Sequence, residues 1–158
     1  MIAMAKEIER KFLVNDSWQP KEEGQRMAQG YLCTEPAHTV RVRVKGGRGY
    51  LTVKGRSEGI QREEFEYEIP LRDAEAMLQL CDGPLVEKVR YREKWGAFCW
   101  EIDVFSGAND GLCVAEIELP DDQAEFPRPS WLGREVSGEV RYYNSQLIKH
   151  PYSEWKKV

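Results

Sequence analysis

The sequence predicts an α+β fold in which antiparallel strands predominate and a few helices flank them. Apolar and charged residues alternate in segment after segment, which is the period of a strand with two different faces. Glycines and prolines separate these segments, and only two stretches show helical spacing. The chain has 158 residues and no internal repeat, so we expect one domain over residues 1–158.

The first expected strands lie before residue 55. Residues 7–12 form one strand, and a second, short strand ends at residues 30–34. Residues 40–44 alternate valine with arginine, which strongly indicates a strand. The glycine-rich stretch 45–49 predicts a hairpin turn, and residues 50–54 form the return strand.

Later strands follow the same alternation, at residues 62–69, 86–92, 98–104 and 113–119. Two other stretches are expected to be helical. Residues 73–81 place apolar side chains at helical spacing between Pro70 and Gly83. Residues 137–149 form the expected closing helix, with Ser137 as its N-cap.

The charged side chains fall on one face of the expected strands. In an ordinary one-sided sheet that face mixes polar and charged groups, whereas here it is almost wholly ionisable. Two explanations are open: a solvated face of an open antiparallel sheet, or a closed barrel with the charged row inside. Closure would remove free edges and turn the apolar row outward, where the two helices could cover part of it. The charged row consists of Glu7, Glu9, Lys11, Arg41, Arg43, Lys54, Glu64, Glu66, Lys88, Arg90, Glu101, Asp103, Glu116 and Glu118.

Composition argues against several classes of protein. The formal net charge is -4, so no overall positive field would recruit nucleic acid. No apolar run approaches the about 18 residues of a transmembrane helix, and no signal-peptide core is present. We therefore expect a cytoplasmic protein with no membrane or nucleic-acid partner. The four cysteines form no C-x-x-C pair and are expected to be reduced thiols. The sequence leaves the oligomeric state open.

The two signs of charge suit two kinds of ligand. Arginine and lysine bind phosphate oxygens, and paired carboxylates bind hard divalent cations such as Mg²⁺ or Mn²⁺. Both together fit a metal-complexed polyphosphate. No Walker loop or G-x-G-x-x-G motif is present, so side chains would hold the phosphates.

In this order, the strand pairs resemble the CYTH superfamily, the triphosphate tunnel metalloenzymes. The resemblance covers nearly the whole chain and implies a closed eight-stranded antiparallel β-barrel, a tunnel with a charged lumen and flanking helices. It also implies a small-molecule triphosphate substrate and one or two divalent metals. The opening of the chain is similar to that of small bacterial tripolyphosphatases. The matching motifs are Glu7-x-Glu9-x-Lys11, Arg41-x-Arg43, Lys54, Glu64-x-Glu66, Lys88-x-Arg90, Glu101-x-Asp103 and Glu116-x-Glu118.

The resemblance implies a role for each matching residue. Mg²⁺ or Mn²⁺ would be the cofactor, and the middle acidic pairs could orient water or hold cations instead of binding the metal. The expected metal ligands are Glu7, Glu9, Glu64, Glu66, Glu101, Asp103, Glu116 and Glu118. The expected substrate-binding residues are Lys11, Arg41, Arg43, Lys54, Lys88 and Arg90. The expected catalytic residues are Lys11, Lys88, Glu116 and Glu118.

Residues outside these motifs are expected to have structural or solvated positions. Four charged residues extend the strand rows and are expected to be solvated strand ends: Arg62, Glu68, Arg92 and Lys94. Three tryptophans are expected to pack rather than to stack on a base: Trp100, Trp131 and Trp155.

The expected function is metal-dependent hydrolysis of a triphosphate, with inorganic tripolyphosphate as the leading substrate. One alternative is a class IV-type adenylate cyclase, which uses the ribose hydroxyl of ATP as the nucleophile. Another is a non-catalytic module that binds polyphosphate or a nucleotide. The full set of acidic pairs argues against the second alternative, because pure anion binding would be better served by fewer carboxylates.

Overall fold

A computed structural model describes residues 6–155. Its strands are β1 (Lys6–Val14), β2 (Gln25–Glu35), β3 (His38–Lys45), β4 (Arg48–Gly55), β5 (Gln61–Ile69), β6 (Val86–Trp95), β7 (Phe98–Phe105), β8 (Cys113–Glu118) and β9 (Leu132–Glu135). Its helices are α1 (Leu71–Leu80) and α2 (Asn144–Leu147), and 3₁₀ turns lie at Gly107–Asn109, Val140–Tyr142 and Tyr152–Glu154. Among the described helices, none is long and apolar enough to cross a bilayer.

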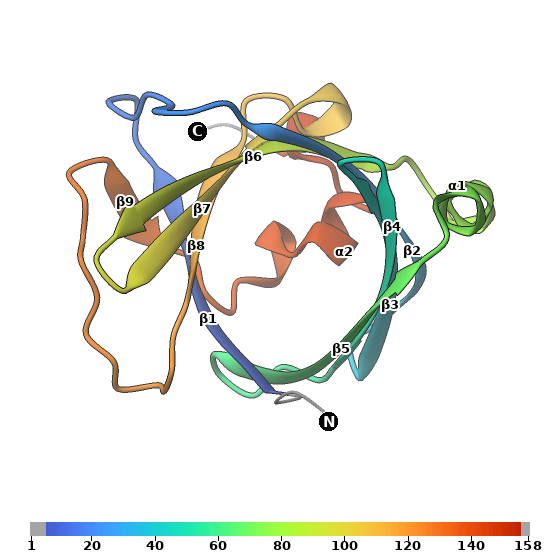
Figure 1. The fold of residues 1–158 in the computed structure, drawn as a ribbon, viewed down its shortest axis with the longest axis horizontal. Helices are drawn as coiled ribbons and strands as arrows, with labels where there is room; N and C mark the ends of the chain where they lie inside the picture. The colour runs from blue at the N-terminus through green and yellow to red at the C-terminus, as the bar shows by residue number, and fades with distance from the viewer. Residues whose placement is uncertain (1–5, 156–158) are drawn as a thin grey trace.

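The strands close into a ring. Hydrogen bonds join them in the order β5-β4-β3-β2-β6-β7-β8-β1, and β5 pairs again with β1 (Figure 1). This last pairing joins three residues from each strand: Lys6 with Glu63, Glu7 with Arg62, and Ile8 with Gln61. β9 adds to β1 beyond this seam, from Phe12 onward. The closed eight-stranded tunnel is therefore confirmed, and the open sheet is wrong.

The outer wall carries the expected apolar row where β1, β7 and β8 meet. Trp100 is fully buried there and packs edge-on against three rings: Phe12 at 5.6 Å, Phe126 at 5.8 Å and Trp131 at 5.6 Å between centroids. The connection between β8 and β9 supplies Phe126 and Trp131 and covers this wall. Trp100 and Trp131 are packing residues, as expected.

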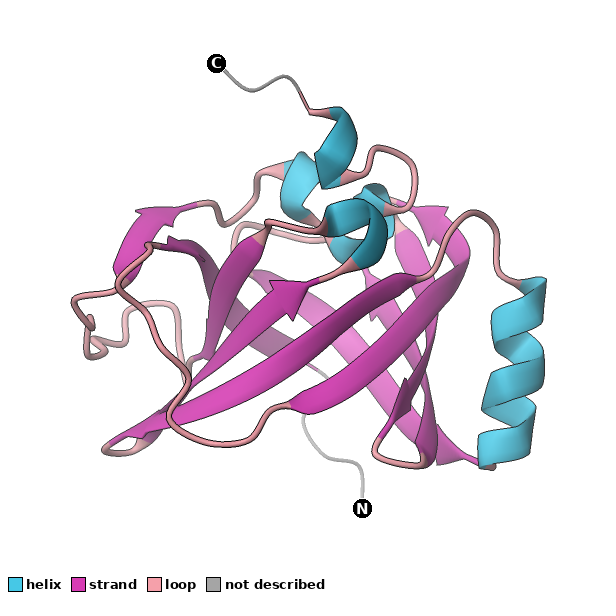
Figure 2. Ribbon diagram, turned by 90° about the horizontal axis from the view of Figure 1, so that it is seen from above, coloured by secondary structure: helices cyan, strands magenta, loops and turns pink. Residues whose placement is uncertain are grey.

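The helix α1 lies against the outside of β3 and β4 (Figures 1 and 2). Gly49 in β4 permits this close approach, because a Cβ at that position would lie 2.4 Å from the Cβ of the buried Ala74. The helix begins directly after Pro70, two residues earlier than expected. Its expected place on the outer wall is confirmed.

The expected closing helix at residues 137–149 is wrong. The chain forms only the turn Val140–Tyr142 and one turn of α-helix in α2. Gly138 has a φ of 78°, which an α-helix does not allow. Ser137 is not an N-cap, because its Oγ accepts a hydrogen bond of 2.9 Å from the backbone N–H of Lys11. This hydrogen bond connects Ser137 to β1 instead of capping a helix.

The closing segment, residues 136–149, also lies in a different place from the one expected. It enters one end of the ring instead of covering the outer wall (Figures 1 and 2). The physical reason is that the lumen-facing rows become apolar at this end and need a partner there. Buried side chains from both sides meet in what we call the apolar plug: Val86, Phe105, Val114, Tyr142 and Leu147.

Two strands differ from the expected elements, whereas Trp155 and the cysteines agree with the expectation. β2 is longer than expected, because it begins at Gln25 within the stretch interpreted as a connection. β9 was not expected. Trp155 packs edge-on against Tyr142 at 5.1 Å and Tyr152 at 5.0 Å, which confirms its structural role. All four cysteines are free thiols, as expected.

Candidate active site

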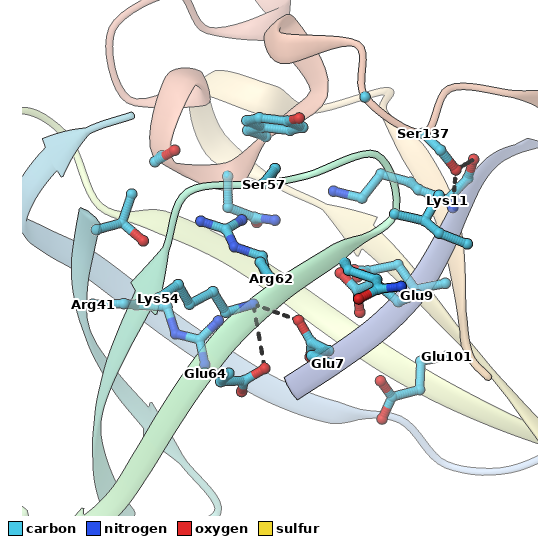
Figure 3. Close-up of a pocket in the computed structure, with 18 of the residues that line it drawn as sticks. Glu7, Glu9, Lys11, Arg41, Lys54, Ser57, Arg62, Glu64, Glu101 and Ser137 are labelled. Carbon is cyan, nitrogen blue, oxygen red and sulfur yellow. Dashed lines mark hydrogen bonds and ion pairs between the residues drawn. The ribbon is translucent and has the colours of Figure 1, made fainter. Parts of the chain in front are cut away.

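A cavity of about 260 Å³ occupies the lumen beside the apolar plug (Figure 3). Every second residue of the surrounding strands faces it, because successive side chains of a strand point to opposite faces. The loop between β4 and β5 adds Ser57, and the closing segment adds Tyr143 and Asn144. The result is a charged chamber built from most strands of the ring.

The structure brings most of the predicted site residues together around this cavity. The wall includes Glu7, Glu9, Lys11, Arg41, Arg43, Lys54, Glu64, Glu66, Lys88, Arg90, Glu101 and Glu116. Two predicted residues are placed elsewhere. Asp103 is fully buried behind the wall, and Glu118 is exposed beyond it.

The first acidic group surrounds Lys54. Its Nζ lies 3.3 Å from a Glu7 oxygen and 3.8 Å from a Glu64 oxygen (Figure 3). Burial, followed by a hydrogen bond shared with Glu64, raises the pKa of Glu7 to about 7. A single lysine therefore does not fully compensate these carboxylates near neutral pH.

The second acidic group joins Glu9 of β1 to Glu116 of β8. Burial and the neighbouring Glu116 raise the pKa of Glu9 well above its usual range. Burial would also raise the pKa of Glu116, but Lys11, the hydrogen bond from Glu9 and Arg90 together hold it well below its usual range. The hydrogen bond between the two carboxyl groups therefore favours the protonated form of Glu9 and the ionised form of Glu116.

Asp103 anchors two cations. Its oxygens lie 2.7 Å from Lys88 Nζ and 2.7 Å from Arg90 Nε. Burial acts to raise the pKa of Asp103, but Arg90 and Lys88 lower it to about 2. Burial lowers the pKa of Lys88 to about 7, although Asp103 partly offsets this. Lys88 also donates to Asn144 Oδ1 at 3.2 Å, which ties it to the closing segment.

Other carboxylates hold arginines against the wall. Arg41 donates to Glu66 at 3.2 Å, and Thr52 donates to the same carboxylate at 3.0 Å. Arg90 lies 3.3 Å from Glu101 through its Nη1 atom. Burial and repulsion from Glu7 and Glu101 raise the pKa of Glu118. Glu118 therefore belongs to the same acidic surroundings although it does not line the cavity.

Four cations of the wall have no carboxylate within ion-pair distance in the described part of the chain: Lys11, Arg43, Lys45 and Arg62. Lys11 Nζ donates to the backbone oxygen of Tyr142 at 3.2 Å. Arg43 Nε donates to the neutral Gln29 Oε1 at 2.8 Å. Buried cations without a counter-ion are costly, so this part of the wall favours an anion.

The sequence interpretation missed two further cations of the wall, Arg62 and Lys45. The expected solvated position of Arg62 is wrong, because the β1–β5 seam turns it into the ring opposite Glu7. Its Nη2 donates to Gly55 O at 3.1 Å, and its buried Nε has no hydrogen-bond partner among the described residues. The alternating rows Arg41-x-Arg43-x-Lys45 and Arg62-x-Glu64-x-Glu66 carried the signal for both. Three other row ends are exposed as expected: Glu68, Arg92 and Lys94.

The acidic residues of the wall fit a divalent cation by their chemistry. Within residues 6–155, no three acidic side chains already converge in the arrangement of a metal site. Instead, burial is the main cause that raises the pKa values of Glu7 and Glu9, and the neighbouring carboxylates Glu64 and Glu116 add to it. Hard oxygen donors in this state are what Mg²⁺ or Mn²⁺ prefers, since the cation would take the place of the protons.

Comparisons with known proteins agree with this geometry. A family model described as the CYTH domain matches residues 5–152. The chain is 50% identical to an inorganic triphosphatase of Acetivibrio thermocellus over 156 residues, 98% of this chain and 100% of that protein. It is 36% identical to an inorganic triphosphatase of Nitrosomonas europaea over 146 residues, 89% of this chain and 95% of that protein.

A solved structure has the same fold. The crystal structure of the inorganic triphosphatase NE1496 matches with a TM-score of 0.65 and 32% identity, covering 94% of this chain and 95% of that one. The family match spans all the described strands, and the two relatives match over most of their lengths. The chain belongs to the CYTH domain family.

Proposed function

We propose that this protein is a divalent-metal-dependent inorganic triphosphatase that hydrolyses a terminal phosphoanhydride of tripolyphosphate. One observation carries the proposal: a single cavity holds cations that lack an anion and buried carboxylate pairs in which the raised pKa values of Glu7 and Glu9 favour additional positive charge. A tripolyphosphate with its metal supplies an anion and a cation. The names of the two relatives, each an inorganic triphosphatase, support the same activity.

In this proposal the acidic residues have different tasks. Glu7, Glu9 and Glu116 would hold Mg²⁺ or Mn²⁺, which when bound neutralises charge on the phosphate oxygens. Asp103, Glu66 and Glu101 hold the cations of the wall, since their oxygens are already engaged by arginine or lysine. Glu64 stays close to Lys54, and Glu118 contributes negative charge from outside the cavity wall.

The basic residues bind and stabilise the phosphate oxygens. Lys11, Arg43 and Arg62 can turn toward an anion without breaking an ion pair with a carboxylate. Lys88 is held between Asp103 and Asn144, and its pKa of about 7 allows it to hold or release a proton near neutral pH. This property suits a group beside the leaving oxygen. We also propose that residues 1–158 act as one domain in a reducing cytoplasm, which the four free thiols support.

A direct assay tests the proposed function. Purified protein is offered tripolyphosphate or ATP with Mg²⁺ or Mn²⁺, and released phosphate and cyclic AMP are measured. We expect phosphate from tripolyphosphate and no activity in EDTA. Cyclic AMP from ATP would favour the cyclase instead, and binding without turnover would favour a non-catalytic module.

A matched pair of variants separates the cavity from the surface. Lys11→Ala should reduce kcat/KM for tripolyphosphate by at least about 100-fold, because it removes a charged contact in a water-poor site. Lys94→Ala removes the same group from an exposed strand end and should leave kcat/KM within about twofold. Equal effects of the two substitutions would contradict the placement of the active site in the lumen.

A further inference from the structure

Arg43 differs from the other buried arginines of the lumen in its partner. Its side chain is buried, and its Nε donates to Gln29 Oε1 at 2.8 Å. Gln29 and Arg43 lie directly opposite each other in the β2–β3 pairing. In the described part of the chain, no carboxylate lies within ion-pair distance of Arg43. Burial, followed by repulsion from Arg41 and Arg90, lowers the pKa of Arg43 to about 9.

By contrast, carboxylates neutralise the charges of the two neighbouring arginines. Arg90 contacts Asp103 through two nitrogens, at 2.7 and 2.8 Å. Arg41 contacts Glu66 at 3.2 Å. A substrate phosphate that binds either residue must compete with a carboxylate. Arg43 offers the rest of its guanidinium to the cavity without that competition.

Gln29 is itself fixed in one orientation. It is fully buried, and its Nε2 donates to the hydroxyl of Tyr31 at 3.1 Å. That bond directs the amide nitrogen toward Tyr31 and the amide oxygen toward Arg43. The guanidinium is thereby held by one neutral acceptor on its Nε side, which leaves the fork of terminal nitrogens for a ligand.

We propose that Gln29 is a positioning residue that aims Arg43 at a phosphate group of the substrate and, being neutral, leaves its charge unneutralised. The inference rests on the proposed function, because it takes the anion bound by Arg43 to be a phosphate group of tripolyphosphate. A glutamate would have the same shape as Gln29 but would form a buried ion pair with Arg43. Such an ion pair would stabilise the ligand-free protein and compete with phosphate for Arg43.

The test uses two variants and a control in the full chain. Gln29→Glu introduces the competing carboxylate, and Gln29→Met removes the acceptor with little change of size. Gln123→Glu adds the same charge at an exposed position in the connection between β8 and β9. For each protein we would measure kcat and KM for tripolyphosphate with Mg²⁺, the Kd of tripolyphosphate without metal by calorimetry, and the Tm without ligand.

The expected result is weaker binding without loss of stability. Gln29→Glu should raise KM and the metal-free Kd by at least about tenfold, while its Tm is equal to or higher than that of the wild type. Gln29→Met should raise KM by about threefold or more and lower the Tm, because it leaves Arg43 without an acceptor. Gln123→Glu should match the wild type in all of these measurements.

Other results would overturn the inference. An unchanged KM in Gln29→Glu would show that the charge of Arg43 is not reserved for phosphate. A lower Tm with an unchanged metal-free Kd would assign Gln29 a structural role only. If the wild type binds tripolyphosphate without hydrolysing it, the proposed function falls, and a weaker Kd in Gln29→Glu still supports the inference. If the wild type does not bind tripolyphosphate, both fall.

Discussion

At the scale of single residues, Glu9 illustrates how a site can be arranged for a ligand that the empty protein lacks. Its pKa is raised well above the usual range by burial and by Glu116, which favours the protonated form that can donate to Glu116. A glutamine can donate the same hydrogen bond without ionising. The side chain therefore contributes little as an anion until a cation arrives.

We expect Glu9→Gln to leave the metal-free protein at least as stable as the wild type, by about 0–2 kcal/mol. The same substitution should reduce hydrolysis severely and shrink the rise in Tm that Mg²⁺ or Mn²⁺ produces. Thermal melts with and without metal check this result. A clear loss of stability in the metal-free variant would make Glu9 a structural partner of Lys54 or Lys11 and would remove it from the metal ligands.

Arg62 gives a second prediction at this scale. Its Nε is buried without a partner in the described structure, and its charge lies opposite Glu7 at the seam. Arg62→Ala should raise the KM for tripolyphosphate by about 5- to 50-fold, the loss of one charge-assisted phosphate contact. Arg92→Ala, on an exposed part of β6, is the matched control. A KM that is unchanged in both variants would show that Arg62 does not bind the substrate and has the role of a solvated strand end.

The sequence predicts the inward-facing residues well, because alternate residues of a strand always lie on opposite faces. It does not predict depth along the tunnel. Asp103 and Glu118 have the same parity as their neighbours Glu101 and Glu116, yet one lies behind the wall and the other beyond it. The stagger of neighbouring strands sets that depth, and it depends on pairings between β2 and β6 and between β1 and β8 that are distant in the chain.

At the scale of elements, the hairpins were predictable and the closing segment was not. Gly46 and Gly47 both have positive φ, so the turn between β3 and β4 is determined locally. The closing segment has helical spacing in its sequence but is shaped by contacts with distant strands. Its Tyr142 and Leu147 are buried by residues of β6, β7 and β8, and this tertiary burial outweighs local helix propensity.

The contact between α1 and β4 gives an element-scale prediction. A Cβ at position 49 would lie 2.4 Å from the Cβ of Ala74, so Gly49→Ala must push the helix away from the ring. We expect a loss of about 1–3 kcal/mol in the free energy of unfolding, measured by urea denaturation. Gly47→Ala is a useful contrast, because nothing lies within 4 Å of its Cβ and its cost would come from backbone strain alone. Full stability of Gly49→Ala would contradict the close packing of α1.

At the scale of the whole molecule, the stability of the metal-free protein should depend on pH in a characteristic way. The pKa of Glu7 is about 7 in the folded protein, against an ordinary glutamate value of 4.5 that applies to the unfolded chain. Between these two values the native state binds more protons than the unfolded state, so stability must fall as the pH rises from about 4.5 to 7. Below this window Asp103 acts oppositely, because its folded pKa of about 2 means that its contribution is lost as the pH falls.

We expect the metal-free free energy of unfolding to decrease by about 1–3 kcal/mol between pH 5 and 7.5, measured by denaturant titration. Glu7→Gln should flatten this decrease, since an amide does not titrate. Saturating Mg²⁺ should also flatten or reverse it, because the cation binds the ionised carboxylates. A wild-type stability that rises with pH through this window would show that the acidic groups are already compensated.

The apolar plug has a consequence for the order of events in turnover. Because the closing segment fills one end of the ring (Figure 2), we expect the charged chamber to be reached from the other end. For a hydrolase of tripolyphosphate, substrate would then arrive and both products would depart along one route. A fresh substrate cannot follow until pyrophosphate has left, so pyrophosphate should inhibit competitively, and its escape becomes a candidate for the slowest step of the cycle.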